Sequence, residues 1–351
     1  MSIIEGMKKA ALPTPTAPTI TTTPYPTLRA GMILYLLVLI GTTLITLGFS
    51  GNVETSFLRL VTAVFLCAGL TLLAMLLTRV PADTLYGARP TVRFLLSGLV
   101  AGLAIYVFAS WLYLFLSRLF GGLFGNLPAP LRIQGAGATE IALFGQITLF
   151  ALILPLCYGI LFYGFLYHGA RGLGRWRAVL FVALLYGIFG IFAGGQGLTA
   201  GPSYFFVGLA AGAFALRSGS GLAAVCVLAG FNLGDPILSG VLGGALRRAG
   251  NDVLGFELLT LAALSAFLTV VLVQVARLTA TPTRAWRPAA PGRLWWLLWI
   301  PIALLVVFYG ASEIRVRQIE RARAAAPILP GSGSTLPPAV PTATPIAAPP
   351  R

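Results

Sequence analysis

The chain has 351 residues, of which 58% are hydrophobic and only 9% are charged, and its formal net charge is +15. Soluble domains carry about 25% charged residues, so this composition excludes an ordinary soluble protein and indicates an all-α polytopic membrane protein. The positive charge lies in the segments that connect apolar stretches. That distribution favours the lipid bilayer as a partner and no nucleic acid.

The chain begins with a Pro/Thr-rich segment, residues 1–28, which predicts a disordered tail. Residues 29–311 form the predicted transmembrane helical domain, with about eight to nine apolar stretches near the ~20 residues that cross a bilayer. The nine candidate spans lie near residues 31–49, 57–78, 94–117, 140–167, 178–195, 203–216, 221–246, 257–277 and 294–311. The sixth is short, as a tilted or partly re-entrant segment would be.

Beyond the last span, residues 312–326 are charged and contain no Gly or Pro, which predicts a helical extension out of the membrane. Glu313 and Arg317 stand four apart, a spacing that places them on one helix face. The extension is either a solvated helix end or a docking surface for a partner. Residues 327–351 are rich in proline and predict a second disordered tail.

Lysines and arginines gather in alternate connections between the spans. They are Lys8, Lys9, Arg29, Arg79, Arg89, Arg93, Arg171, Arg175, Arg177, Arg217, Arg277, Arg284, Arg287 and Arg293. Because such residues favour cytoplasmic connections, we expect an integral protein of the cell (cytoplasmic) membrane with its N-terminus in the cytoplasm. Nine spans then place the C-terminus outside, although the arginines between Arg315 and Arg323 oppose that topology.

Small residues and cysteines within the spans predict close helix packing. Glycines recur four apart at Gly98 and Gly102, Gly208 and Gly212, and Gly240 and Gly244. This spacing lets helix backbones approach each other closely in lipid. Cys67, Cys157 and Cys226 also fall within spans and predict packing roles, not disulfides. The only histidine, His168, lies more than two helical turns from Cys157, so we expect no cysteine protease.

The segment from Pro155 to Tyr167 carries a recognisable pattern of proline, aromatic and glycine residues. The pattern consists of Pro155, Phe162, Gly164, Leu166 and Tyr167. This pattern resembles the first motif of the CPBP family, which reads roughly P-x-x-E-E-x-x-F-R-G-x-L-Y. The two glutamates of that motif fall on Tyr158 and Gly159, and its arginine falls on Tyr163. The family includes the CAAX prenyl endopeptidases and the bacteriocin-processing or immunity (Abi) proteins.

Two further motifs of the family follow in register. The second, F-x-x-x-H, is best matched from Tyr186 to Gly190, where glycine stands in place of the histidine. The third, H-x-x-x-N/D, is best matched from Leu228 to Asn232, where leucine replaces the histidine and the asparagine is retained. The resemblance implies a CPBP-like helical core at about residues 140–246.

The resemblance also implies where an intramembrane protease would keep its chemistry. In the family, glutamates and histidines activate water, with an asparagine or aspartate assisting. Tyr158, Gly159, Gly190 and Leu228 cannot replace them, because tyrosine has a pKa near 10 and glycine and leucine do not titrate. We therefore expect a pseudoenzyme with no catalytic residue, no bound metal and no cofactor.

Asn232 and Asp235 lie in the middle of the seventh apolar stretch, beside Gly234 and Pro236. A carboxylate inside a membrane is costly and by default indicates function. In one interpretation the helix ends near Gly234 and Asp235 lies at an interface. In the other, a polar cavity binds a lipid, an isoprenoid or a peptide segment. Its predicted lining is Tyr158, Tyr163, Tyr186, Asn232 and Asp235.

These expectations favour a structural or regulatory membrane subunit that holds either a membrane-protein partner or a hydrophobic ligand. An active CPBP-type endopeptidase with CAAX-like processing is the first alternative, although the chain contains no Glu-Glu pair. A small-solute transporter is the second alternative. The absence of internal repeats and the sparse intramembrane charge count against it.

Overall fold

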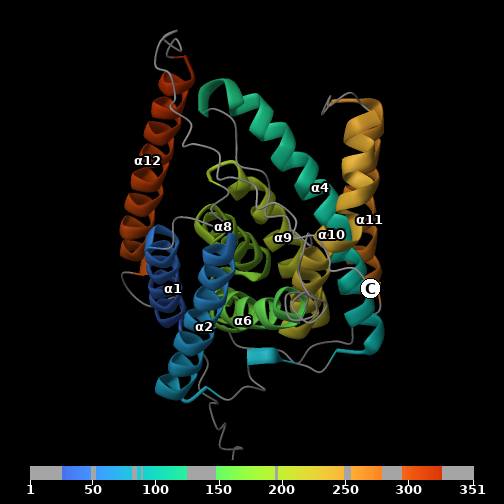
Figure 1. Cartoon of the computed structure of the whole chain (residues 1–351). Helices are drawn as coiled ribbons and strands as arrows, with labels where there is room; N and C mark the ends of the chain where they lie inside the picture. Colours follow the sequence, from blue (N-terminus) through green and yellow to red (C-terminus); the bar gives the residue numbers. More distant parts are fainter. Residues whose placement is uncertain are drawn as a thin grey trace, which may run out of the picture.

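The computed structural model describes residues 26–48, 53–80, 85–87, 90–124, 148–193, 197–248, 254–278 and 295–325. Within these ranges every element is a helix, which confirms the predicted all-α class (Figure 1). The two predicted tails fall almost wholly outside the described residues.

The described ranges contain fourteen helical elements in chain order. They are α1 (Leu28–Gly48), α2 (Val53–Thr78), α4 (Val92–Phe124), η1 (Leu149–Ile153), α6 (Leu154–Gly159), η2 (Ile160–Leu166), α7 (Tyr167–Ala170), η3 (Arg171–Leu173), α8 (Arg175–Ala193), α9 (Ala200–Ser218), α10 (Gly221–Arg248), α11 (Phe256–Leu278), η4 (Trp295–Leu298) and α12 (Trp299–Ala325). In the described part of the chain, eight helical segments are long and apolar enough to cross a membrane, so this is a polytopic membrane protein.

Helix α9 corresponds to the short sixth candidate and is not among those eight segments. It nevertheless runs antiparallel to α8 along most of that helix. Gly212 lies near Val179 at the start of α8, and Gly201 lies near Ile191 at its end. Its 19 residues span about 28 Å at the rise of an α-helix. It packs against α4, α8, α10 and α11. Protein therefore surrounds it, and its surface does not need the hydropathy of a lipid-facing helix.

Helices α4 and α10 run parallel and approach closely through glycines. A Cβ at Gly102 would lie 2.8 Å from the Cα of Gly230, and one at Gly98 would lie 3.0 Å from the carbonyl oxygen of Ala223. The predicted packing role of Gly98 and Gly102 is thus confirmed within the molecule. The same holds for Gly208, where a Cβ would lie 3.0 Å from the Cα of Ala183 on α8.

Helix α10 is continuous from Gly221 to Arg248 and contains Pro236 in its interior. The interpretation in which the helix ends near Gly234 is therefore wrong. Proline removes one backbone N–H and is tolerated in membrane helices where neighbouring groups compensate. Glycines on α4 and α10 allow the two backbones to pack closely before Pro236. This contact holds the helix in place through the proline.

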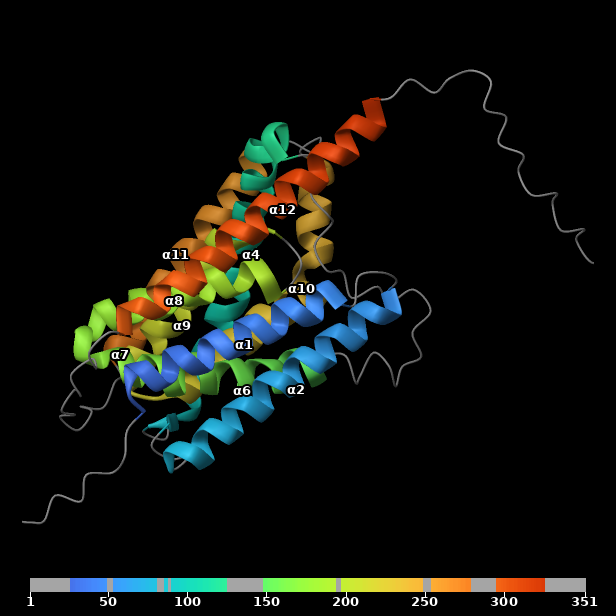
Figure 2. The same cartoon turned by 90° about the vertical axis from the view of Figure 1, so that its left-hand side faces the viewer.

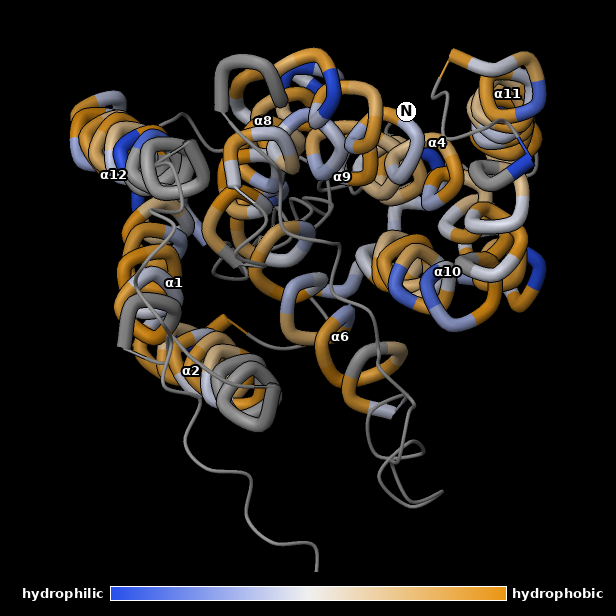
Figure 3. The backbone as a smooth tube through the Cα atoms, turned by 45° about the horizontal axis from the view of Figure 1, so that its top comes forward, coloured by the Kyte–Doolittle hydropathy of each residue, from blue (hydrophilic) through white to orange (hydrophobic). Residues whose placement is uncertain are grey.

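Seven of the arginines found in alternate connections lie at one end of the bundle, which we call the arginine end. Contacts between segments far apart in sequence establish this grouping: Gly169 packs on Leu28, and Gly87 forms an isolated bridge with Ser220. The arginines at this end are Arg29, Arg79, Arg93, Arg171, Arg175, Arg177 and Arg217. Hydrophobic residues predominate along the helices between the two ends (Figure 3).

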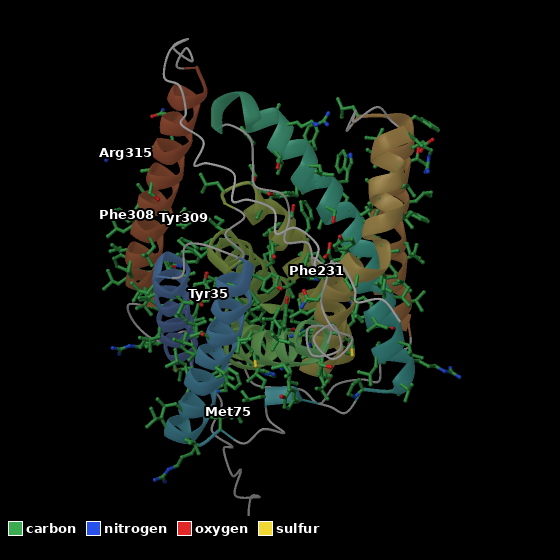
Figure 4. All side chains as sticks on the ribbon, viewed as in Figure 1. Tyr35, Met75, Phe231, Phe308, Tyr309 and Arg315 are labelled. Carbon is green, nitrogen blue, oxygen red and sulfur yellow. The ribbon has the colours of Figure 1, made fainter. Side chains whose placement is uncertain are left out.

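Helix α12 lies at the side of the bundle and extends beyond its neighbours at the end opposite the arginine end (Figure 2). Phe181 of α8 contacts Trp295 and Trp299 edge-on, with ring centroids 5.7 and 5.8 Å apart, and Phe192 contacts Tyr309 at 4.9 Å. Phe308 points away from the bundle and is 71% exposed, whereas Tyr309 faces it (Figure 4). The charged residues after Ser312 continue the same helix, as far as Ala325.

Candidate functional site

The three segments that resemble family motifs meet in the centre of the bundle. The first forms α6 and η2, and all residues from Leu161 to Leu166 are buried there. A Cβ at Gly159 would collide with the side chain of Val225 on α10. Phe162 packs on Tyr186 of α8, with ring centroids 4.9 Å apart. The fold therefore brings together the positions at which the resemblance places the motifs.

Aromatic rings fill this meeting point in a continuous series, which we call the aromatic chain. Its members are Tyr35, Phe162, Tyr186, Tyr204, Phe231 and Tyr106. Successive ring centroids lie 5.9, 4.9, 5.8, 5.9 and 5.8 Å apart. Each such pair contributes ~0.5–1.5 kcal/mol beyond its buried area. The series joins α1, η2, α8, α9, α10 and α4, and Figure 4 labels two of its members, Tyr35 and Phe231.

The three tyrosines predicted to line a cavity are buried against this chain. Tyr158 packs edge-on against Phe189, with ring centroids 5.0 Å apart, and also contacts Phe162. The hydroxyl of Tyr163 donates a 2.9 Å hydrogen bond to the carbonyl oxygen of Gly208 on α9. The structure therefore gives Tyr163 a direct bond between two helices, and gives Tyr158 and Tyr186 a place in the aromatic packing.

The two positions at which the resembling motifs carry histidine are also enclosed. A Cβ at Gly190 would lie 2.6 Å from the Cβ of Tyr204, so the absence of a side chain there admits the tyrosine ring. Leu228 is 1% exposed. Neither position has a titratable group, and in both cases neighbouring side chains occupy the space around the residue.

Asp235 stands at the end of the aromatic chain. Its Oδ1 accepts a 2.9 Å hydrogen bond from the hydroxyl of Tyr106, and both side chains are half-buried. Gly234 gives the Tyr106 ring room to lie against the α10 backbone. Tyr106 lies at the middle of the candidate span Val92–Phe120, and Asp235 lies near the end of the candidate span Gly221–Leu238.

The five predicted lining residues fall into two groups. Tyr158, Tyr163 and Tyr186 belong to the buried centre, whereas Asn232 and Asp235 are half-buried on α10. Tyr204 and Phe231 connect the groups, since their rings lie between Tyr186 and the Tyr106–Asp235 pair. Sequence reasoning missed Tyr106 and Tyr204. Neither stands in a motif, and only their contacts reveal them.

Among the described residues, no group of three or more His, Cys, Asp or Glu side chains is placed to hold a metal ion. Cys67, Cys157 and Cys226 are free thiols. Cys67 and Cys157 are buried in the bundle, as expected for packing residues.

Comparisons of this chain with protein-family models, curated proteins and solved structures found no match.

Proposed function

We propose that this protein is a non-catalytic membrane subunit with a CPBP-like helical core, and that it holds a partner protein in the cell membrane. The observation that carries this proposal is the aromatic chain. Rings from six helical elements occupy the point where the motif-like segments meet. A protease that uses water would need titratable groups and access for a peptide at this point.

The packing at the motif positions supports a structural role for the centre. Gly159 lies against Val225 and Gly190 lies against Tyr204, so small residues here serve close contact between helices. An active endopeptidase would have to place its catalytic groups elsewhere. The aromatic centre instead ties the bundle together as a rigid support.

Helix α12 is the element best suited to bind the partner. Its segment Trp295–Ser312 is the least buried of the eight candidate spans. Beyond it the helix continues to Ala325 with two glutamates and four arginines, and Arg315 is exposed. A long helix that is apolar in the membrane and charged outside it offers a partner two chemically distinct surfaces.

The proposal is tested by extracting the protein from native membranes in a mild detergent and measuring the intact mass of the assembly. We expect a stoichiometric partner, and we expect Arg315→Glu to weaken its retention. Arg118→Glu is the matched control, because Arg118 is exposed on α4 towards the same end of the bundle. A monomer from wild-type membranes would overturn the proposal, as would equal loss of the partner in both variants.

A second function, binding of a hydrophobic ligand with a polar group, is favoured by the Tyr106–Asp235 pair. This half-buried hydroxyl and carboxyl, which lie within two candidate spans, could accept a hydrogen bond from such a ligand. The same mass measurement distinguishes this function, since it would reveal a monomer that carries a bound small molecule. Asp235→Ala should then remove the bound molecule while the monomer remains folded.

A further inference from the structure

Two arginines at the arginine end lie over the faces of aromatic rings. The guanidinium carbon of Arg171 is 4.8 Å from the ring centroid of Tyr167, and that of Arg217 is 5.3 Å from the ring centroid of Trp176. Stacking on a ring fixes the plane of a guanidinium. Both arginines are half-buried, so their stems are held by the protein.

The fold brings these arginines to one place from three elements. Arg171 opens η3, just after the long helix that ends with α7. Because α8 and α9 are antiparallel, the first turn of α8, with Arg175 and Trp176, lies beside the last turn of α9, with Arg217. We call Arg171, Arg175, Trp176 and Arg217 the headgroup cluster.

The positive charge of this cluster is not balanced by acidic residues nearby in the sequence. No Asp or Glu occurs in residues 141–234. Arg175 and Arg177 are exposed in the first turn of α8, where the helix dipole is positive and favours an anion. The Nε of Arg217 is buried, and the described residues supply no acceptor for it. These features together create a strong local preference for an anion.

The surface next to the cluster is apolar. Trp176, Leu180 and Leu184 follow each other four apart on α8 and are 47%, 49% and 46% exposed. Residues with this spacing form one stripe along a helix. The stripe leads from the cluster towards the middle of the bundle. Tryptophan at its head is typical of the level at which lipid headgroups meet the hydrocarbon core.

We propose that the headgroup cluster binds the phosphate of an anionic phospholipid, whose acyl chain lies along Trp176, Leu180 and Leu184. Arginine recognises phosphate with two parallel hydrogen bonds, and basic clusters at membrane-helix ends select anionic headgroups. The stripe identifies a lipid as the source of the phosphate, because a soluble phosphate compound has no use for exposed leucines. The site lies at the opposite end of the bundle from the charged part of α12 and is independent of partner binding there.

The test is native mass spectrometry of the delipidated protein titrated with phosphatidylglycerol, phosphatidylcholine or glycerol 3-phosphate. We expect the wild-type protein to bind phosphatidylglycerol in preference to phosphatidylcholine. Glycerol 3-phosphate should bind far more weakly than phosphatidylglycerol. Arg171→Gln with Arg217→Gln should weaken phosphatidylglycerol binding by roughly 30-fold, since each arginine contributes ~1 kcal/mol to attraction for anionic lipid.

Matched variants separate this site from a general effect of charge. Arg118→Gln with Arg248→Gln removes two exposed arginines from the other end and should leave phosphatidylglycerol binding unchanged. Trp176→Ala removes an exposed ring, should preserve the fold, and should weaken binding several-fold. If the double arginine variant fails to fold, Trp176→Ala and the exposed Arg175→Gln carry the test. Equal binding of the two phospholipids, or wild-type affinity in Trp176→Ala and Arg175→Gln, would overturn the proposal.

Discussion

Tyr106 of α4 donates a 2.9 Å hydrogen bond to Oδ1 of Asp235 on α10, and both residues lie within candidate membrane spans. This bond ends the aromatic chain, because the Tyr106 ring also packs on Phe231 with centroids 5.8 Å apart. It lies one turn past the close glycine contact between the same two helices. Asp235, an acidic residue within the candidate span Gly221–Leu238, is therefore tied to the packed centre of the bundle.

We expect Asp235→Asn to fold at least as stably as the wild-type protein. Asparagine keeps an oxygen that can accept the Tyr106 hydrogen bond, and it removes the cost of holding a carboxylate in a membrane-crossing helix. Asp235→Ala and Tyr106→Phe remove the bond, and each should lower the free energy of unfolding by ~0.6–1.7 kcal/mol. Thermal unfolding in detergent measures these differences. An Asn variant as unstable as the Ala variant would show that the charge itself is required.

We expect two Gly→Ala substitutions to act in opposite directions. At Gly102 the new methyl group would meet the α10 backbone, 2.8 Å from the Cα of Gly230, and such overpacking costs ~1–3 kcal/mol. At Gly240 nothing lies within 4 Å of the new Cβ, so the better helix propensity of alanine stabilises by up to ~1 kcal/mol. Chemical or thermal unfolding of the two variants under one condition measures both effects. Equal stability of the two variants would contradict the close packing of α4 on α10.

We expect that glutamates introduced at Tyr158 or Gly159 do not create an endopeptidase. Tyr158→Glu would bury a carboxyl group among Phe162 and Phe189, and Gly159→Glu would drive a side chain into Val225. Burying an unpaired carboxyl in an apolar site costs several kcal/mol or leaves it protonated. Each variant should lose yield and thermal stability, and neither should cleave a prenylated reporter peptide. Cleavage by either variant would show that the centre retains room for a substrate.

Much of the fold could be predicted from the sequence, because lipid imposes a long apolar pattern on each crossing helix. The class, the spans and the helical extension after Ser312 follow from composition. The course of α10 could not be predicted, since Gly234 and Pro236 are also typical of a helix end. Only the packing of Gly230 on Gly102 shows that the helix continues. The aromatic chain was likewise hidden, because it joins rings from six elements with no common motif.

We expect Tyr86 to make stability depend on alkaline pH. It lies in the described connection 85–87, where the hydroxyl of Ser220 donates a 3.1 Å hydrogen bond to the Tyr86 carbonyl oxygen. Burial raises the pKa of its phenol above the ordinary value of 10.0. The folded state thus holds the proton more tightly, so this contribution is complete below pH 10 and is lost as pH rises through the raised pKa.

Tyr86→Phe isolates that contribution, because phenylalanine cannot ionise. Between pH 7 and 9 the difference in melting temperature between the two proteins should stay constant. Above pH 10 the wild-type melting temperature should fall faster than that of the variant. Parallel melting curves from pH 8 to 11.5 measure the difference, and identical slopes above pH 10 would show that the Tyr86 ring is not protected on folding.

We expect the two ends of the bundle to face opposite sides of the membrane, with the arginine end in the cytoplasm. Helix α9 crosses the bundle antiparallel to α8. With α9 included, the described helices from α1 to α12 cross the bundle nine times. With the three native cysteines replaced by alanine, a single cysteine at Arg315 or Arg118 should react with an impermeant maleimide on intact cells. One at Arg175 should react only after the membrane is opened. Reaction of the Arg175 and Arg315 positions from the same side would contradict the passage of α9, whereas a full exchange of sides would invert the orientation that the arginines predict.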